Sequence, residues 1–260
     1  MKYWKEGGYI IGIKNKEELQ AMREGGRMLG KILVELQKMA QPGVTCLELD
    51  NKAEELMQQY GVLPSFKGYK GFPAVICTSV NDEVVHGIPT SYILKDGDLL
   101  TIDAGLVHKS FHSDSAISFG IGTGLSTVGQ KLIKTAEKAL AKAIAKVKPG
   151  IRVGQISALI QDTVEHEGFS VVHDLIGHGI GYKLHEDPEV PNYRDGNPGP
   201  LLQVGMTIAI EPIITAGKRD LEILDDEWTY VTRDGSLAAQ VEHTIAITEK
   251  GAEILTARDK

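Results

Sequence analysis

The chain has 260 residues, of which 42% are hydrophobic and 24% charged, and its formal net charge is −7. This length suffices for a large domain with a substantial core, and the acidic balance argues against binding through phosphate contacts, so we expect no direct nucleic-acid partner. Two cysteines cannot build a disulfide framework, and the first residues contain no apolar stretch long enough for a signal peptide or membrane span. We therefore expect a cytoplasmic protein without a membrane partner.

Two helices with clear boundary signals follow a short N-terminal lead. The first is predicted over about 16–40, with Asn15 as its N-cap. The second is predicted over 46–60, between the N-cap Thr45 and the terminating Gly61. Each cap is followed three residues later by a glutamate, which predicts a capping box at both helix starts.

Apolar runs rich in β-branched residues come next and then give way to a second pair of helices. We expect antiparallel strands within 72–80, 98–107 and 110–122. Two further helices are predicted over about 126–147 and 153–167, again followed by strand-like segments. The order of elements in the first half is thus repeated in the second.

Landmarks in the two halves are separated by a nearly constant offset. The Pro-Gly pair at 42–43 recurs at 149–150, an offset of 107 (149 − 42), and Asp103 is matched by Glu211 at an offset of 108 (211 − 103). A constant spacing over several landmarks is the signature of an internal duplication. The segments "VHGIP" and "LHEDP" also correspond, with a proline three residues after the histidine in each.

The duplication predicts a single domain with a shared site where its halves meet. We expect one domain over 1–260, built from halves at about 16–120 and 125–250 with a short N-terminal extension, because no linker-like stretch separates them. The predicted fold class is α+β, with helices outside antiparallel sheets.

Four carboxylates lie in segments that otherwise predict buried strands. Asp103 and Glu211 each end an apolar run, and Asp114 and Glu242 lie inside strand-like segments. An unpaired buried carboxylate is strongly destabilising, so each must be paired, protonated or bound to a metal. For any one of them alone, a turn cap or a salt bridge is the simpler explanation.

The segment 177–188, "GHGIGYKLHEDP", adds imidazoles on a glycine-rich backbone. Glycines on both sides of His178 suit a backbone that passes close to a metal, a substrate or another strand; the alternative is a surface loop with solvated histidines. Four carboxylates with one imidazole suit two ions such as Mn(II), Fe(II), Co(II) or Zn(II), which could hold a nucleophilic hydroxide. The residues therefore predict a dinuclear metallohydrolase.

In order and spacing, these acids and His178 resemble the metal ligands of type I methionine aminopeptidases, over about residues 18–253. The matching residues are Asp103, Asp114, His178, Glu211 and Glu242. The resemblance implies the duplicated "pita-bread" fold. The interval between His178 and Glu211 is 33 residues (211 − 178), too short for the insertion of the type II enzymes, and no Cys/His-rich extension precedes the domain. A bacterial-type enzyme is implied.

The resemblance also implies a role for each ligand. Asp103 would chelate one metal, Asp114 and Glu242 would bridge both, and His178 and Glu211 would complete the other. The cofactors would be two divalent ions, drawn from Co, Mn, Fe, Zn and Ni. Glu211 would also accept a proton from the bridging water, whose hydroxide attacks the scissile carbonyl.

Two further histidines and an apolar pocket would bind the substrate. By resemblance, His185 would contact the oxygen of the scissile amide and His86 would lie beside its nitrogen. The methionine side chain would contact Tyr69, Phe72, Cys77 and Trp228, and aromatic edges suit a thioether. For each pocket residue, ordinary core packing is the alternative.

The sequence departs from the usual family pattern near the site. Lys70 stands where histidine is usual, Leu184 and Val241 stand where aromatic residues are common, and Ser115-Ala116 replaces threonine-serine. None of these positions was expected to touch a ligand. The departures suggest a divergent member, such as a second copy beside a housekeeping enzyme.

The implied function is removal of the initiator methionine from nascent chains with a small second residue. Its partners would be nascent N-termini, with transient ribosome association, and we expect a monomer. One alternative is an Xaa-Pro peptidase of the same fold, which usually carries an additional N-terminal domain. The other is a non-catalytic pita-bread protein that binds ribosomes or RNA; such proteins lose metal ligands and carry basic tails.

Overall fold

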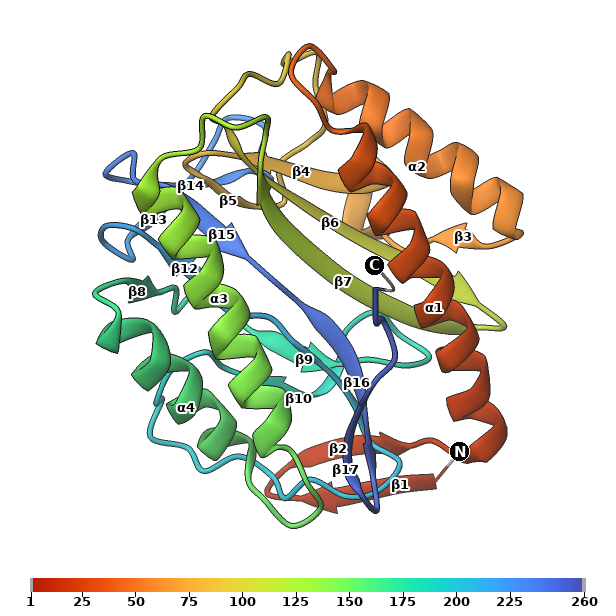
Figure 1. The fold of residues 1–260 in the computed structure, drawn as a ribbon. Coiled ribbons are helices and arrows are strands. Elements are labelled where there is room, and N and C mark those ends of the chain that lie inside the picture. Colours follow the sequence, from red (N-terminus) through yellow and green to blue (C-terminus); the bar gives the residue numbers. More distant parts are fainter. Residues whose placement is uncertain (1, 259–260) are drawn as a thin grey trace.

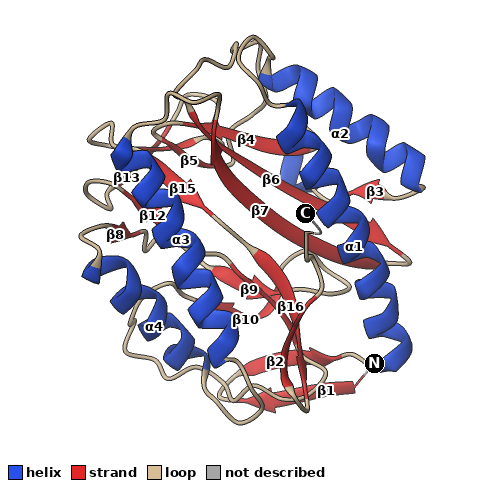
Figure 2. Ribbon diagram, in the orientation of Figure 1, coloured by secondary structure: helices blue, strands red, loops and turns tan. Residues whose placement is uncertain are grey.

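Helices cover one face of strongly curved antiparallel strands in this protein (Figures 1 and 2). The structure is a computed structural model that describes residues 2–258, so both ends of the predicted 1–260 domain lie outside the described residues. Its helices are α1 (Lys16–Met39), α2 (Cys46–Tyr60), α3 (Thr127–Lys146) and α4 (Val153–His166), with one 3₁₀ turn at Tyr69–Gly71. The four predicted helices are confirmed to within one or two residues.

The capping signals read from the sequence position the first two helices. The Asn15 side chain accepts from the Glu18 amide at 2.9 Å, while the Glu18 carboxylate accepts from the Asn15 amide at 2.8 Å. Thr45 and Glu48 make the same reciprocal pair, and Gly61 ends α2 in the left-handed conformation. Both predicted capping boxes are confirmed.

Within residues 2–258 the strands form five sheets. One of the two largest sheets contains β3 (Leu63–Pro64), β4 (Ile76–Val80), β6 (Leu99–His108) and β7 (Phe111–Gly120). The other contains β9 (Gly177–Gly179), β10 (Glu186–Val190), β11 (Thr207–Ile210), β16 (His243–Thr248) and β17 (Gly251–Ile254). The smaller ones contain β8 (Ser170–Val171), β12 (Ile213–Thr215) and β15 (Ala238–Gln240); β5 (Glu83–Val85), β13 (Leu221–Ile223) and β14 (Tyr230–Thr232); and the hairpin of β1 (Lys2–Glu6) and β2 (Tyr9–Ile13).

Two of the expected carboxylate positions are corrected by the strand boundaries. Asp103 lies in the middle of β6, opposite Ala116 of β7, and does not end its strand. Glu242 lies between β15 and β16 and is not inside a strand. The end of an apolar run does not show whether the strand ends there as well. Here β6 continues past Asp103 because it stays hydrogen-bonded to β7.

Each pair of helices packs against its own set of strands. Leu29, Leu33 and Leu36 of α1 join a core with α2, β4 and β6, whereas α3 and α4 join a second core with β11 and β16. These two cores meet where β7 runs beside residues 240–244 (Figure 1). The Ser118 hydroxyl donates to the Gln240 carbonyl at 2.7 Å across this junction. The site residues described below line a cavity along the same seam.

The C-terminal segment crosses α1 at very short range. Gly26 and Gly30 lie on the buried face of α1, where an added Cβ would collide with the carbonyl oxygens of Leu255 and Ala257. The glycines therefore permit the C-terminal segment to lie against the helix. Further along, the Arg258 guanidinium donates at 2.8 Å to the carbonyl oxygen of Glu242, close to the cavity.

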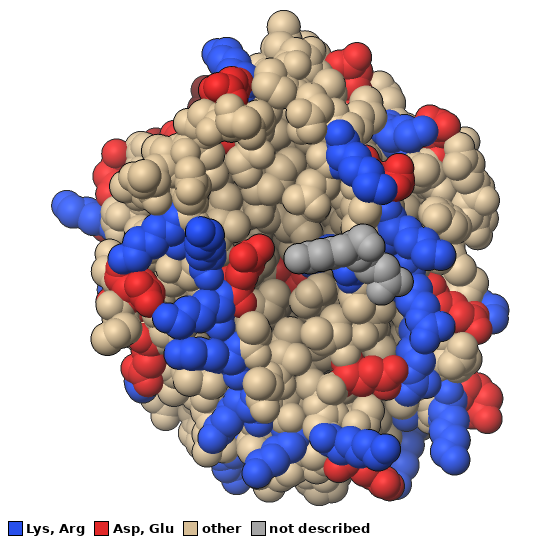
Figure 3. Space-filling model, in the orientation of Figure 1, with Lys and Arg blue, Asp and Glu red and all other residues tan. Residues whose placement is uncertain are grey.

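Basic side chains gather over α1 and α3 on the face shown in Figure 3, although the chain is acidic overall. The helix α3 carries Lys131 and Lys138, which both pair with Glu167, at 3.5 and 2.8 Å. The expected absence of a nucleic-acid partner rested on net charge alone and stays a prediction. Among the described residues no helix is both long and apolar enough to cross a membrane.

Gly30→Ala should lower the free energy of unfolding by about 1–3 kcal/mol, because the added methyl group collides with backbone that has no flexible end to move. The gain in helix propensity, about 1 kcal/mol, is too small to reverse the sign. Urea unfolding measures the change. The exposed α1 substitution Gln37→Ala should stay within about 0.5 kcal/mol of the wild type; equal stability of Gly30→Ala and wild type would contradict the close packing.

Candidate metal centre and catalytic cavity

A cavity of about 220 Å³ brings together every site residue expected from the sequence. Its lining includes Asp103, Asp114, His178, Glu211 and Glu242, the histidines His86 and His185, and the pocket residues Tyr69, Phe72, Cys77 and Trp228. These side chains come from segments that are far apart in the chain.

The strands bring four of the five candidate ligands into one region. Asp103 of β6 and Asp114 of β7 are two register positions apart on paired strands, since Asp114 lies opposite Gly105. Side chains at such diagonal positions share a face of the sheet. Glu211 directly follows β11, and His178 is the central residue of β9, which pairs with β11.

The carboxylates and the imidazole approach one another closely. Asp114, His178 and Glu242 each offer one ligand atom, and these atoms lie within 4.8 Å of one another. The Nε2 atom of His178 is 3.8 Å from Oε1 of Glu211. The Gln240 side-chain amide connects Asp103 to Glu211, because it donates to Asp103 at 3.4 Å and to Glu211 at 3.2 Å.

Burial and mutual repulsion make charge on these acids costly. Burial raises the pKa of Asp103 to about 7. Burial, reinforced by the neighbouring carboxylates, also raises the pKa values of Asp114, Glu211 and Glu242 well above their usual range. Burial lowers the pKa of His178 to about 4, so that its imidazole is neutral at pH 7. A neutral imidazole among carboxylates that resist ionisation is a poor arrangement for packing alone.

The donor atoms fit divalent cations. Oδ1 of Asp103, Oδ1 of Asp114 and Oε1 of Glu242 are buried without a hydrogen-bond partner. Buried polar atoms in native proteins are normally satisfied, so unpaired carboxylate oxygens that line one cavity call for a cation there. Carboxylate oxygens with one neutral imidazole are the donors that Mn(II), Fe(II), Co(II) and Zn(II) accept. The chain thus contains a buried Asp/His/Glu metal-ligand group.

The two histidines expected to contact the substrate line the same cavity. His185 lies with its ring centroid 4.3 Å from that of His178, and its Nδ1 is 2.9 Å from the hydroxyl of Tyr69. Burial and the neighbouring His178 lower the pKa of His185 to about 3. His86 follows β5 in the left-handed conformation, with φ of 58°, and burial lowers its pKa. Both imidazoles are therefore neutral at pH 7 and can hydrogen-bond to an amide.

An apolar recess adjoins the histidines. The rings of Phe72 and Trp228 meet edge to face with centroids 5.1 Å apart. Cys77 is buried beside them, and burial raises the pKa of its thiol well above the usual value, which removes it as a nucleophile. Leu184 is also buried in this cluster. The recess can enclose an unbranched apolar side chain.

Gln240 is a polar residue of this cavity that the sequence did not single out. It is the last residue of β15, two positions before Glu242, and a period of two continued past the end of the strand would place both side chains on the same face. The same alternation turns Val241 away into the core formed with α3 and α4. Ile176 and Phe66 also line the cavity without having carried a distinguishing signal.

The departures from the family pattern differ in their contacts. Lys70 and Leu184 line the cavity, and the Lys70 ammonium lies 5.5 Å from the centre of the Tyr69 ring. The Ser115 hydroxyl donates to the carbonyl oxygen of Glu242 at 2.7 Å. The expectation that none of these positions touches a ligand residue is therefore wrong for Ser115.

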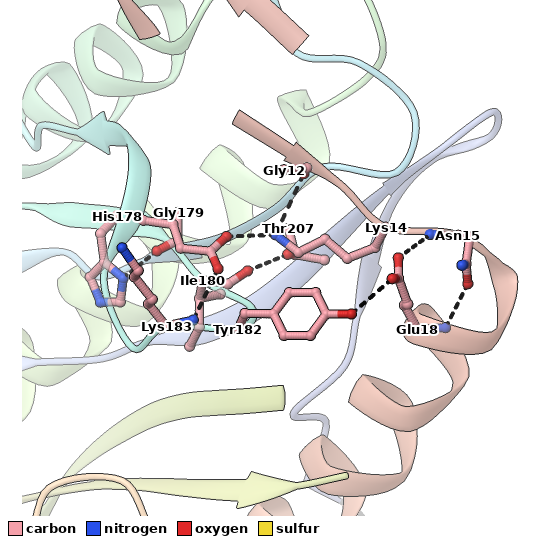
Figure 4. Close-up of polar contacts among 11 residues, drawn as sticks. Gly12, Lys14, Asn15, Glu18, His178, Gly179, Ile180, Tyr182, Lys183 and Thr207 are labelled. Carbon is pink, nitrogen blue, oxygen red and sulfur yellow. Dashed lines mark hydrogen bonds and ion pairs between the residues drawn. The ribbon is translucent and has the colours of Figure 1, made fainter. Parts of the chain in front are cut away.

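The glycines around His178 serve close approach between strands. A Cβ at Gly179 would collide with the carbonyl oxygen of Asp187 on the neighbouring strand β10. At Gly181 it would collide with Lys14, whose buried ammonium binds Glu186 at 2.8 Å. Figure 4 shows this region, with Lys14 reaching across from the N-terminal segment toward the backbone after His178. The sequence left open whether the backbone at these glycines approaches a metal, a substrate or another strand. The structure supports close approach to other protein segments.

The sequence and the fold can be compared with known proteins. The model of "Metallopeptidase family M24" matches residues 20–249. A methionine aminopeptidase of Clostridium perfringens is 49% identical over 247 residues, which cover 95% of this chain and 99% of the relative. The methionine aminopeptidase of Escherichia coli K12 is 40% identical over 250 residues, with coverage of 95% and 94%.

Solved structures agree with these relatives. Methionine aminopeptidase from Thermotoga maritima is 42% identical with a TM-score of 0.93, covering 96% of this chain and all of that one. The prolidase from Pyrococcus horikoshii shares the fold at 22% identity and a TM-score of 0.78, and this chain spans 64% of it.

Together the fold and the cavity define a metal-dependent peptidase with the duplicated pita-bread architecture. More particularly, the chain belongs to metallopeptidase family M24 and, within it, to the bacterial type I methionine aminopeptidases that match it over nearly its whole length. The family and the fold expected from the sequence are confirmed. A non-catalytic pita-bread protein is not supported, because the acids and imidazole are all present in the cavity.

In the metal-free protein, Asp103→Asn should be stabilising relative to wild type by an amount that grows with pH. The folded-state pKa of about 7 exceeds the unfolded value of 3.8, so the wild type loses stability as the pH rises from about 4 to about 7. The variant avoids this loss, and the difference should increase by at most about 1.4 kcal/mol per pH unit and level off above pH 7.

Urea unfolding in the presence of a chelator measures this difference. Excess Mn(II) at pH 7.5 should then favour the wild type, because an ion that binds only the folded chain stabilises it by mass action. A difference that is independent of pH would contradict the account of the buried acids.

Proposed function

We propose that this chain is a dinuclear metal-dependent aminopeptidase that removes methionine from the N-terminus of newly made polypeptides. The observation that carries the proposal is that one cavity contains both a buried carboxylate–imidazole group and an aromatic recess. The first suits hydrolysis and the second suits a thioether side chain. The similarity to methionine aminopeptidases supports the same substrate.

The five acidic and imidazole side chains would hold the ions. We infer that Asp103 would hold one ion, that Asp114 and Glu242 would be shared by both, and that His178 and Glu211 would hold the second. When bound, two such ions supply a Lewis acid and lower the pKa of water, which makes a nucleophile available at neutral pH. The donor set accepts Co, Mn, Fe, Zn or Ni, and the choice among them depends on availability.

The chain's own side chains would handle the proton and the scissile amide. Glu211 would accept a proton from the attacking water, a role open to a carboxylate that is hydrogen-bonded to that water. His185 would donate to the amide oxygen, with its Nδ1 already engaged by Tyr69 at 2.9 Å. His86 would lie beside the amide nitrogen.

The recess of Tyr69, Phe72, Cys77 and Trp228 would hold the methionine side chain. Two imidazoles must then reach the amide that directly follows this residue. We infer a preference for a small second residue, because a bulky side chain there would displace His86 or His185. The substrates would be nascent N-termini in the cytoplasm, which the enzyme would reach during transient association with the ribosome. The enzyme would be a monomer with one domain of two similar halves.

The substrate class can be tested with two kinds of peptide. The purified chain should release methionine from Met-Gly-Ser in the presence of one or more of Co(II), Mn(II), Fe(II), Zn(II) and Ni(II). It should not cleave Xaa-Pro peptides, since the resemblance to prolidase extends to the fold alone. Chromatographic detection of the free amino acid measures both. Cleavage of Xaa-Pro peptides without methionine release would overturn the assignment.

Substitutions can separate metal binding from substrate binding. Glu242→Ala should abolish methionine release and reduce the metal content, because it removes a ligand to both ions. His185→Ala should lower turnover by about a hundredfold and leave the metal content near normal. Turnover assays and elemental analysis on the same preparations measure the two effects. His166→Ala, at an exposed position on α4, serves as the matched control.

Full turnover by Glu242→Ala would contradict the dinuclear site. Loss of metal from His185→Ala would instead make His185 a ligand.

A further inference from the structure

A second hollow adjoins the catalytic cavity. It has a volume of about 700 Å³ and lies between the N-terminal hairpin and residues 176–189. Ile176, His178 and His185 line both hollows. A chain held at His185 in the first hollow can therefore continue into the second.

Half-exposed apolar side chains stand around this second hollow. Tyr3 of β1 and Ile10 of β2 are 52% and 53% exposed, and Tyr182 on the other side is 40% exposed. Large apolar side chains that remain exposed around one concave surface mark a binding site more often than chance exposure does. The hairpin that carries two of them lies next to β10 (Figure 1).

The walls of the hollow are fixed to each other. The Ile10 amide donates to the Asp187 carboxylate at 2.8 Å, which joins β2 to β10. The Tyr182 hydroxyl donates to Glu18 of α1 at 3.0 Å, as Figure 4 shows. The buried Lys14 ammonium also binds Glu186, which lines the hollow, at 2.8 Å. The surface is thus formed in advance, which reduces the ordering cost of binding.

We propose that this hollow, which we call the hairpin groove, binds the substrate residues that follow the second residue of the polypeptide. The inference rests on the proposed aminopeptidase function. A substrate whose first residue lies in the aromatic recess must extend out of the cavity, and the groove begins at His185. An extended chain advances about 3.3 Å per residue, so three or four residues span about 10–13 Å.

The groove favours extended peptides with apolar side chains. In such a peptide alternate side chains point the same way and can contact Tyr3 and Ile10 together. The hairpin would thereby select among nascent chains by residues well beyond the scissile bond. Leu and Ala at these positions should bind better than Gly and Ser.

Peptide length provides the test. Three peptides are compared by kcat/KM: Met-Gly-Ser, Met-Gly-Ser-Leu-Ala-Leu-Ala and Met-Gly-Ser-Gly-Ser-Gly-Ser. In the wild type the Leu-containing peptide should exceed Met-Gly-Ser by about three- to tenfold, the effect of burying one or two apolar side chains, while the Gly-Ser peptide should not. Ile10→Ser and Tyr3→Ser should each bring this ratio toward one.

The ratio is insensitive to the amount of folded enzyme, because all peptides are assayed on one preparation. Ile254→Ser on β17, at a position that is 38% exposed and outside the groove lining, is the matched control and should keep the wild-type ratio. A wild-type ratio near one, an unchanged ratio in both groove variants, or an equal change in Ile254→Ser would overturn the proposal. Failure to release methionine even from Met-Gly-Ser would overturn the proposed function instead.

Discussion

Burial of four neighbouring carboxylates in one cavity is the constraint on which the rest of the structure depends. Each acid is removed from water and faces other acids, so none can ionise cheaply without a cation. The fold places their backbones on strands and strand ends that are anchored by two separate cores. The rigid strands therefore hold the acids close together, which lowers the stability of the metal-free protein. Binding of divalent ions would offset this loss of stability.

The residues around the acids serve different parts of the cavity. Gln240 and the carbonyl contacts of Ser115 and Arg258 fix the acids and their backbone. In the proposed function, neutral His185 would face the scissile amide, and the aromatic recess would limit which side chain can enter. Beyond them the hairpin groove extends the surface that a polypeptide can contact.

Much of this arrangement could be predicted from the sequence. Caps such as Asn15 and Thr45 fixed the helix starts because capping is a local interaction. The candidate ligands could be selected because a carboxylate in an apolar run needs a partner. The groove could not be foreseen, since it depends on the hairpin lying beside β10, a contact between residues more than 170 positions apart. The sequence predicts a strand end at Asp103, where the apolar run stops. In the structure β6 continues through Asp103 because it pairs with β7, and a local pattern does not reveal this pairing.

Metal binding followed by calorimetry tests the central claim most directly. Titration of the metal-free chain with Mn(II) near pH 6.5, in buffers of different ionisation enthalpy, gives both the number of ions bound and the protons released. Two ions per chain with a net release of protons are predicted, because acids with raised pKa values must ionise to bind. Binding without proton release, or no binding at all, would contradict the view that these carboxylates are held together for divalent cations.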